Sequence, residues 1–156
     1  MRISFLPRVD RLRRLLRGTF HKILSFSQSN FQPALAHKFV MDWALNHFVF
    51  DRKEIKYILG EHQSIGAHTD IYQFQAGGVK IYRWTHPIRP FGTSTNRQCA
   101  GCSRLGTLRP NVTPTEILLK CNKCKDENRY TFPAGWEWID GPMSKSDKGG
   151  AWIVYK

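Results

Sequence analysis

The chain has 156 residues, of which 41% are hydrophobic and 13% aromatic, so it is long enough and apolar enough to bury a core. No apolar run approaches the roughly 20 residues of a membrane-spanning helix, so no transmembrane segment is expected. The formal net charge of +12 favours polyanionic partners, nucleic acid first and acidic membrane second, with solubility alone as the alternative.

Residues 1–30 form a basic amphipathic arm that carries seven Lys and Arg against one acid. Apolar residues at three- and four-residue spacing predict a helix over residues 4–26. These residues are Phe5, Val9, Leu12, Leu16, Phe20 and Ile23. Three interpretations stay open: the helix packs on the domain, it is a mitochondrial transit peptide, or it binds phosphates or an anionic membrane surface.

A helical hairpin is expected next, in the first part of residues 31–96. Pro33 is well placed near the start of a helix. Asp51 and Glu54 have the spacing of a capping box, which predicts a second, short helix that ends at Gly60. An ordinary helical hairpin is favoured over a helix-turn-helix, because no array of Asn, Gln or Ser faces outward to read bases.

A polar stretch and a β-hairpin complete this region. The stretch holds two acids and two histidines, which suit acid–base catalysis or metal binding: Glu61, His62, His68 and Asp70. The alternative is a loop that caps the hairpin. The hairpin is predicted from alternating residues 71–75 and 79–84 around the turn at residues 76–78. Its Lys80, Tyr82 and Trp84 share one face, which favours core packing over base stacking.

The four cysteines form two Cys-x-x-Cys pairs separated by 18 residues: Cys99 with Cys102, and Cys121 with Cys124. Two such turns facing each other surround one ion with four thiolates, a set that favours zinc or an iron–sulfur cluster over magnesium or calcium. A site closed by four cysteines has no open position for water, so it stabilises the fold and does not catalyse. Two disulfides and a dithiol redox pair are the alternatives.

Residues 97–133 resemble the zinc-ribbon family, in which two such turns are linked by antiparallel strands. The matching residues are the four cysteines and the strand Ile117–Lys120, which enters the second turn. The resemblance implies one structural Zn2+. Many ribbons have Gly directly after each pair, where this chain has Ser103 and Lys125. The loop 109–115 lacks the acidic pair of ribbons of the transcription-elongation-factor type, so no subfamily is assigned.

The expected fold class is α+β, with N-terminal helices, a β-hairpin, and a zinc ribbon with C-terminal antiparallel strands. The last two strands are predicted at residues 135–139 and 151–155. The expected divisions of the chain are the arm 1–30, the two hairpins 31–96, the ribbon 97–133 and the strand pair 134–156.

Three functions of different class follow. The first is a zinc-stabilised module that binds nucleic acid through cations around the ribbon: Arg97, Arg104, Arg109, Lys120, Lys123, Lys125 and Arg129. The second is a protein-interaction or scaffold module, or a fragment of a larger protein, that uses a tryptophan-rich surface. The third is an enzyme built on the polar stretch 61–70. The expected location is intracellular, nuclear or cytoplasmic, and mitochondrial if the arm is a presequence.

Overall fold

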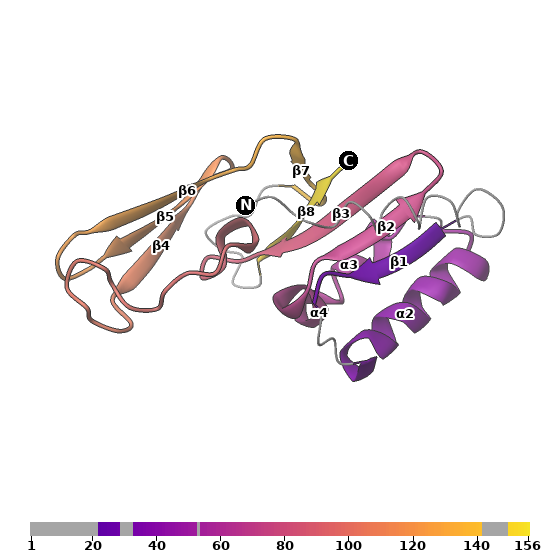
Figure 1. Cartoon of the computed structure of the whole chain (residues 1–156), viewed down its shortest axis with the longest axis horizontal. Coiled ribbons are helices and arrows are strands. Elements are labelled where there is room, and N and C mark those ends of the chain that lie inside the picture. Colours follow the sequence, from indigo (N-terminus) through magenta and orange to yellow (C-terminus); the bar gives the residue numbers. More distant parts are fainter. Residues whose placement is uncertain (1–21, 29–32, 53, 142–149) are drawn as a thin grey trace.

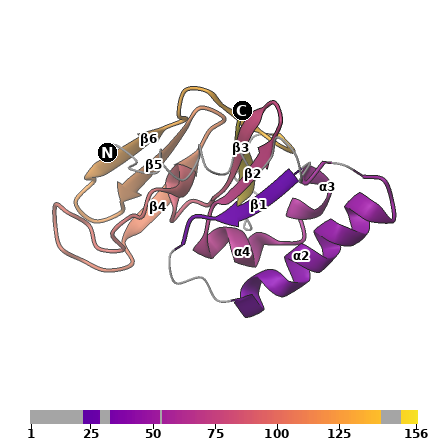
Figure 2. The same cartoon turned by 45° about the vertical axis from the view of Figure 1, so that its right-hand side comes forward.

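The computed structural model describes residues 22–28, 33–52, 54–141 and 150–156. The fold is α+β: two antiparallel sheets, with the helices gathered on one side of the larger sheet (Figures 1 and 2). The helices are α2 (Pro33–Phe48), α3 (Lys56–Leu59) and α4 (Gln63–His68), with a 3-10 turn, η1 (Pro90–Gly92). None of the described helices is long and apolar enough to cross a membrane.

The larger sheet has the strand order β1-β2-β3-β8-β7. Its strands are β1 (Lys22–Phe26), β2 (Ile71–Gln75), β3 (Gly78–Thr85), β7 (Trp136–Trp138) and β8 (Ala151–Tyr155). The hairpin β2–β3 therefore continues into the last strand of the chain, with Trp84 opposite Trp152. Residues between β3 and β7 leave this sheet and build the smaller one, which has the order β4-β5-β6. Its strands are β4 (Leu108–Val112), β5 (Glu116–Cys121) and β6 (Glu127–Thr131).

One core lies between the helices and the larger sheet. The helices contribute Phe39, Ile55, Leu59 and Ile65, and the strands contribute Ile71, Tyr82, Trp84, Trp152 and Val154. Full burial of each large apolar side chain stabilises the fold by about 1.5–3 kcal/mol. Helix α4 approaches the sheet closely, since a Cβ on Gly66 would lie 2.5 Å from the Cβ atom of Trp84. The face of Tyr82 and Trp84 is therefore core, as predicted.

A second core joins the two sheets. Phe91, Val112, Ile117 and Leu119 pack together with Ile153 of β8. The rings of Phe132 and Trp138 stack with their centroids 4.9 Å apart, which ties the end of β6 to β7. The smaller sheet is thus anchored at one end, and its other end, which carries the cysteines, extends away from the larger sheet (Figure 1).

The helix predicted over residues 4–26 is wrong for its last part. Residues 22–26 form strand β1, which pairs with β2 over five residue pairs. Leu24 and Phe26 point to the helix-side core, and Ile23 lies on the opposite face, because successive strand residues alternate. Residues 4–21 lie outside the described part of the chain.

Two further local predictions are wrong. Asp51 has φ 52, which is the left-handed region and not the extended conformation of an N-cap. Helix α3 instead begins at Lys56 after Ile55, without a side-chain cap, and Glu54 forms an ion pair with Lys56. The stretch expected to be a loop contains helix α4.

The tryptophan-rich surface is also absent from the described residues, since none of the five tryptophans is exposed. Trp84 and Trp152 are buried in the first core, whereas Trp43, Trp136 and Trp138 are half-buried. A large indole ring stabilises the fold most when it is removed from water, and these rings fill the two cores.

Candidate metal centre

The two Cys-x-x-Cys turns have the same backbone hydrogen bonds. In the first turn, the N–H group of Ser103 donates to the carbonyl of Cys99 at 2.8 Å, and in the second Lys125 donates to Cys121 at 3.1 Å. Ser103 has φ 54 and Lys125 has φ 66. This left-handed conformation reverses the chain directly after each pair, so both thiols of a pair lie on the same side.

Strand β5 positions the second turn, since Cys121 is its last residue and is fully buried. The N–H group of Cys121 donates to the backbone carbonyl of Asp126 at 2.8 Å, and the N–H group of Asn122 donates to the backbone carbonyl of Thr107 at 2.9 Å. The first turn closes in the same way, because the N–H group of Cys99 donates to the backbone carbonyl of Arg104 at 3.1 Å. Both turns are therefore held by backbone bonds.

The four sulfur atoms converge. All of them lie within 4.8 Å of one another, with 3.4 Å between Cys99 and Cys124 and 3.7 Å between Cys102 and Cys121. A tetrahedral ion with metal–sulfur bonds of about 2.3 Å requires sulfur–sulfur distances of about 3.8 Å. The four cysteines are free thiols. Their spacing and chemistry fit a single metal ion, and they suit a closed structural site.

A hydroxyl group supports the second turn. The Oγ1 atom of Thr107 lies 3.3 Å from the Sγ atom of Cys121, and the N–H group of Lys123 lies 3.4 Å from the same sulfur. The Thr107 hydroxyl, followed by backbone N–H groups, lowers the pKa of the Cys121 thiol to about 5. The thiolate that a metal ion binds is therefore already favoured at this position near neutral pH.

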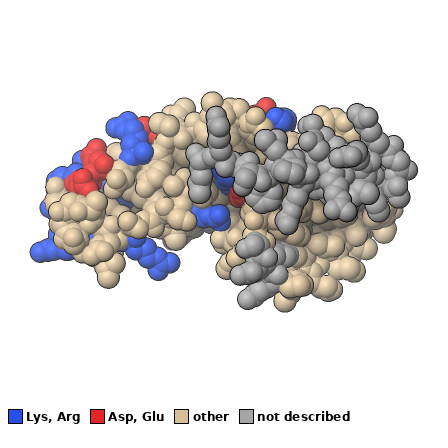
Figure 3. Space-filling view, viewed as in Figure 1, with Lys and Arg blue, Asp and Glu red and all other residues tan. Residues whose placement is uncertain are grey.

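The seven candidate cations of the nucleic-acid hypothesis are all exposed, but two of them pair with acids. Lys120 contacts Glu127 at 2.5 Å, and Arg129 contacts Glu116 at 2.8 Å. Four others form no ion pair with a described residue: Arg104, Arg109, Lys123 and Lys125. They belong to the Cys-x-x-Cys turns and the start of β4, where Figure 3 shows Lys and Arg at the tip of the molecule.

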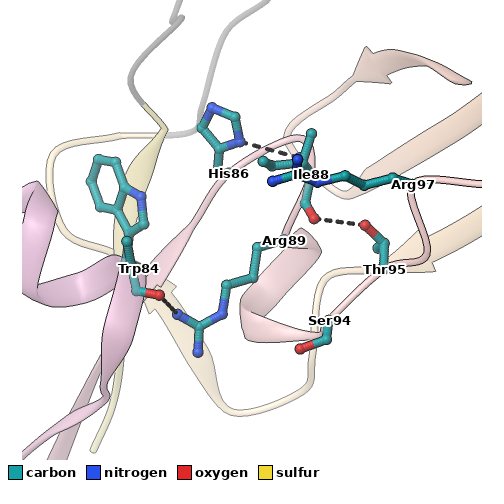
Figure 4. A pocket seen from close by; sticks show the side chains of 8 residues that line it. Trp84, His86, Ile88, Arg89, Ser94, Thr95 and Arg97 are labelled. Carbon is teal, nitrogen blue, oxygen red and sulfur yellow. Dashed lines mark hydrogen bonds between the residues drawn. The ribbon is translucent and has the colours of Figure 1, made fainter. Parts of the chain in front are cut away.

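Arg97 lies elsewhere, at the junction of the two sheets. It lines a cavity of about 390 Å3 together with Trp84, His86 and Arg89 (Figure 4). The Nη1 atom of Arg89 donates to the carbonyls of Gly66 and Ala67 at 2.8 and 2.9 Å. This wall of the cavity is therefore used to hold the end of helix α4.

The polar stretch 61–70 is not assembled into one site. His62 is buried and its Nε2 atom lies 3.0 Å from the Asp42 carboxylate. Asp70 accepts two hydrogen bonds from Arg83, from Nε at 2.9 Å and from Nη2 at 2.6 Å. Glu61 and His68 are exposed. His62 and Asp70 therefore hold structural elements together.

Two features of functional interest were not found from the sequence. Thr107 contacts Cys121 across the β4–β5 hairpin, and only the strand register could have identified it. The second is an exposed apolar surface on α2 and the segment after it, here called the α2 patch. It consists of Met41, Leu45, Phe48, Val49 and Phe50, which are 44–75% exposed. The sequence does indicate this patch, because the apolar residues at 41, 45 and 48 are four and three positions apart and so share one face of a helix.

Comparisons with protein-family models, with curated protein sequences and with solved structures found no match to this chain.

Proposed function

We propose that residues 97–133 form a zinc ribbon with one structural Zn2+ bound by Cys99, Cys102, Cys121 and Cys124. The convergence of four thiols with near-tetrahedral spacing supports this. The three-stranded sheet shares its core with the larger sheet, and a small unit that buries little apolar surface by itself needs such an ion to be stable. The ion would supply folding energy and would leave no open position for chemistry.

The proposed function of this ribbon is to bind nucleic acid. The observation that carries it is the group of cations at its tip that form no ion pair with a described residue, here called the basic tip: Arg104, Arg109, Lys123 and Lys125. Binding of phosphate by these four cations breaks no ion pair with a described acid, whereas Lys120 and Arg129 would first have to leave Glu127 and Glu116. Arg97 would contact a strand that reaches the junction cavity.

The charge of the metal site does not cancel this field. Residues 97–133 carry seven Lys and Arg and three Asp and Glu, a formal charge of +4. Four thiolates on one Zn2+ contribute −2, so the unit keeps a net positive charge. The potential around its tip therefore attracts a polyanion and releases counterions when phosphates bind.

Binding is tested by titrating single-stranded and duplex DNA and RNA against the protein at several salt concentrations. We expect the logarithm of the association constant to fall with the logarithm of the salt concentration, with a slope of roughly −0.7 to −0.9 per phosphate contacted. Binding that does not respond to salt would contradict the proposal, as would no binding at low salt.

A protein-interaction module is the second candidate function, and the α2 patch favours it. Phe48 is 75% exposed and Val49 is 65% exposed, and contiguous exposed apolar surface commonly marks a binding site. A stable partner that co-purifies after nuclease treatment would favour this function. A Phe48→Ser variant should lose that partner, whereas a Lys38→Gln variant on the same helix should retain it.

An intracellular location is part of the proposal, because reduced thiols that bind zinc persist in a reducing compartment. The nucleus and cytoplasm fit a nucleic-acid-binding protein, and mitochondria fit if residues 1–30 act as a presequence. A fluorescent fusion at the C-terminus distinguishes these compartments, since it leaves the N-terminus free.

A further inference from the structure

The junction cavity combines positive charge with apolar surface. Its volume of about 390 Å3 lies in the range of sites that bind small ligands. Two arginines, Arg89 and Arg97, contribute to its walls, and Ala67, Trp84 and Ile88 contribute apolar surface. The described part of its lining contains no Asp or Glu, so no carboxylate there opposes an anion. The cavity therefore suits a ligand that has both a negative charge and an apolar or aromatic part.

The loop after β3 forms one wall of the cavity and is held by its own hydrogen bonds. The N–H group of Ile88 donates to the Nδ1 atom of His86 at 3.2 Å, and the Thr95 hydroxyl donates to the carbonyl of Ile88 at 2.6 Å (Figure 4). The backbones of His86 and Arg89 also bond to each other in both directions, at 3.3 and 2.8 Å. Ile88, which is 56% exposed, is thus an apolar contact in a fixed position. A wall that is already ordered lowers the entropic cost of binding.

The guanidinium group of Arg89 is fixed on two sides. Its Nη1 atom donates to the carbonyls of Gly66 and Ala67, and its Nε atom donates to the carbonyl of Gly92 at 3.4 Å. A guanidinium group has five N–H donors, two of them on Nη2. No hydrogen bond joins the Nη2 atom to a residue in the described part of the chain. Arg89 can therefore donate to a ligand without giving up the bonds that hold helix α4.

Arg97 connects the junction cavity with the ribbon. It is exposed and forms no ion pair with any acid that the structure describes. Only Gln98 separates it from Cys99 in the sequence. The turn that begins at Cys99 closes on the carbonyl of Arg104, a residue of the basic tip. A strand whose phosphates bind the tip can therefore follow the chain back to Arg97 and reach the cavity.

We propose that the junction cavity accepts one unstacked nucleotide of a single-stranded nucleic acid, an inference that rests on the proposed function of the ribbon. The phosphate of this nucleotide binds Arg97. Its base packs against Ile88 and accepts a hydrogen bond from the Nη2 atom of Arg89. Single-strand sites combine these elements: cations that follow the backbone, side chains on which a base packs, and hydrogen bonds to the edge of the base.

The cavity gives the protein a preference that the basic tip alone does not give. Exposed cations bind the phosphates of a single strand and of a duplex alike. A base in a duplex is paired and stacked, so it enters a cavity only after unpairing and unstacking, whereas a base of a single strand avoids most of this cost. The proposal therefore specifies single-stranded nucleic acid as the substrate class of the site.

A variant that fills the cavity tests the proposal in the full chain. Ala67→Leu adds bulk at an exposed position of α4 that lines the cavity, and the matched control, Ser64→Leu, places the same side chain at an exposed position of α4 outside the lining. We expect Ala67→Leu to lower the affinity for a single strand of about 12 deoxythymidines about tenfold, and to change the affinity for a duplex of the same length by less than about twofold. Ser64→Leu should change either affinity by less than about twofold.

Arg97→Gln tests the phosphate contact separately, without filling the cavity. It should lower the affinity for the single strand and reduce the salt slope by about one. Equal single-strand affinities of Ala67→Leu and Ser64→Leu, or equal losses for single strand and duplex, would overturn the cavity proposal and leave binding at the basic tip intact. No binding of either probe by the unmodified protein at low salt would overturn the proposed function, and the cavity proposal with it.

Discussion

Ser103 and Lys125 occupy the same position in the two Cys-x-x-Cys turns. Each follows a second cysteine, each has a positive φ, 54 and 66, and each donates its N–H group to the carbonyl of the first cysteine. A side chain in this left-handed region costs roughly 1–2 kcal/mol, whereas glycine adopts it freely. The turns that hold the thiols are therefore strained at both positions.

Glycine at either position should stabilise the protein. We expect Ser103→Gly and Lys125→Gly each to raise the free energy of unfolding by about 0.5–1.5 kcal/mol, because the local strain is removed. Gly106→Ala is the matched control of opposite sign. Gly106 has φ +67 and open space around its Cβ position, so alanine should cost about 1 kcal/mol. Denaturant unfolding of the zinc-loaded protein measures all three, and destabilisation by both glycine variants would contradict the left-handed conformation of the two turns.

Thr107→Val should weaken the hold on the metal. The hydroxyl lies 3.3 Å from the Cys121 sulfur and is the largest cause of the pKa of about 5. Its removal raises that pKa, so protons compete better with the metal ion. We expect the pH at which zinc is released on acidification to rise, and the affinity for zinc to fall about 10–100-fold.

Thr113→Val is the control for this variant. The Thr113 hydroxyl accepts a hydrogen bond from the N–H group of Glu116 at 3.0 Å, at the opposite end of the same hairpin. It should therefore change stability without moving the pH of zinc release. A release curve of Thr107→Val that superimposes on that of the unmodified protein would show that the hydroxyl has no part in metal binding.

Asp70→Asn should destabilise the fold. Asp70 is 7% exposed and binds Arg83, whose guanidinium also lies over the Trp136 ring at 4.6 Å. Loss of the carboxylate charge weakens both hydrogen bonds to Asp70. Because the Arg83 side chain is 29% exposed, solvent screening limits the expected cost to about 1–2 kcal/mol.

His68→Ala is the comparison for Asp70, because His68 is exposed in the same polar stretch. This substitution should change stability by less than about 0.5 kcal/mol. Thermal unfolding separates the two variants. An Asp70→Asn protein with unchanged stability would contradict the structural role assigned to the carboxylate. It would favour the hypothesis of an enzyme built on the polar stretch 61–70.

Neutralisation of the basic tip should weaken binding of nucleic acid. We expect Arg104→Gln with Lys123→Gln to reduce the salt slope by about one for each phosphate that the variant no longer binds. The control, Lys38→Gln with Lys56→Gln, removes the same charge from α2 and α3, where both lysines pair with acids. A loss of affinity that is equal in the two pairs would indicate a general effect of net charge and no binding site at the tip.

The local sequence pattern was sufficient to predict much of the fold. The alternation of residues 71–75 and 79–84 marks the β2–β3 hairpin, and residues 151–155 form β8 as expected. The cysteine spacing located the candidate metal centre, since all four thiols converge. These features depend on neighbours close in the sequence, or on ligands whose chemistry leaves few alternatives.

Other parts of the fold depend on contacts between residues far apart in the sequence, so the local sequence pattern could not predict them. Residues 22–26 continue the helical spacing of the arm, yet pairing with β2 makes them a strand. The place of β8 between β3 and β7 depends on contacts between segments about 70 residues apart. Which cations form ion pairs also depends on register, because Lys120 meets Glu127 through the pairing of β5 with β6.

A metal measurement on the purified protein, followed by chelation and amide hydrogen exchange, tests the proposed zinc site directly. We expect one zinc per chain, and a loss of exchange protection in residues 97–133 when zinc is removed and the smaller sheet unfolds. Iron in place of zinc, cysteines paired as disulfides, or a metal-free protein that keeps full protection in residues 97–133 would contradict it.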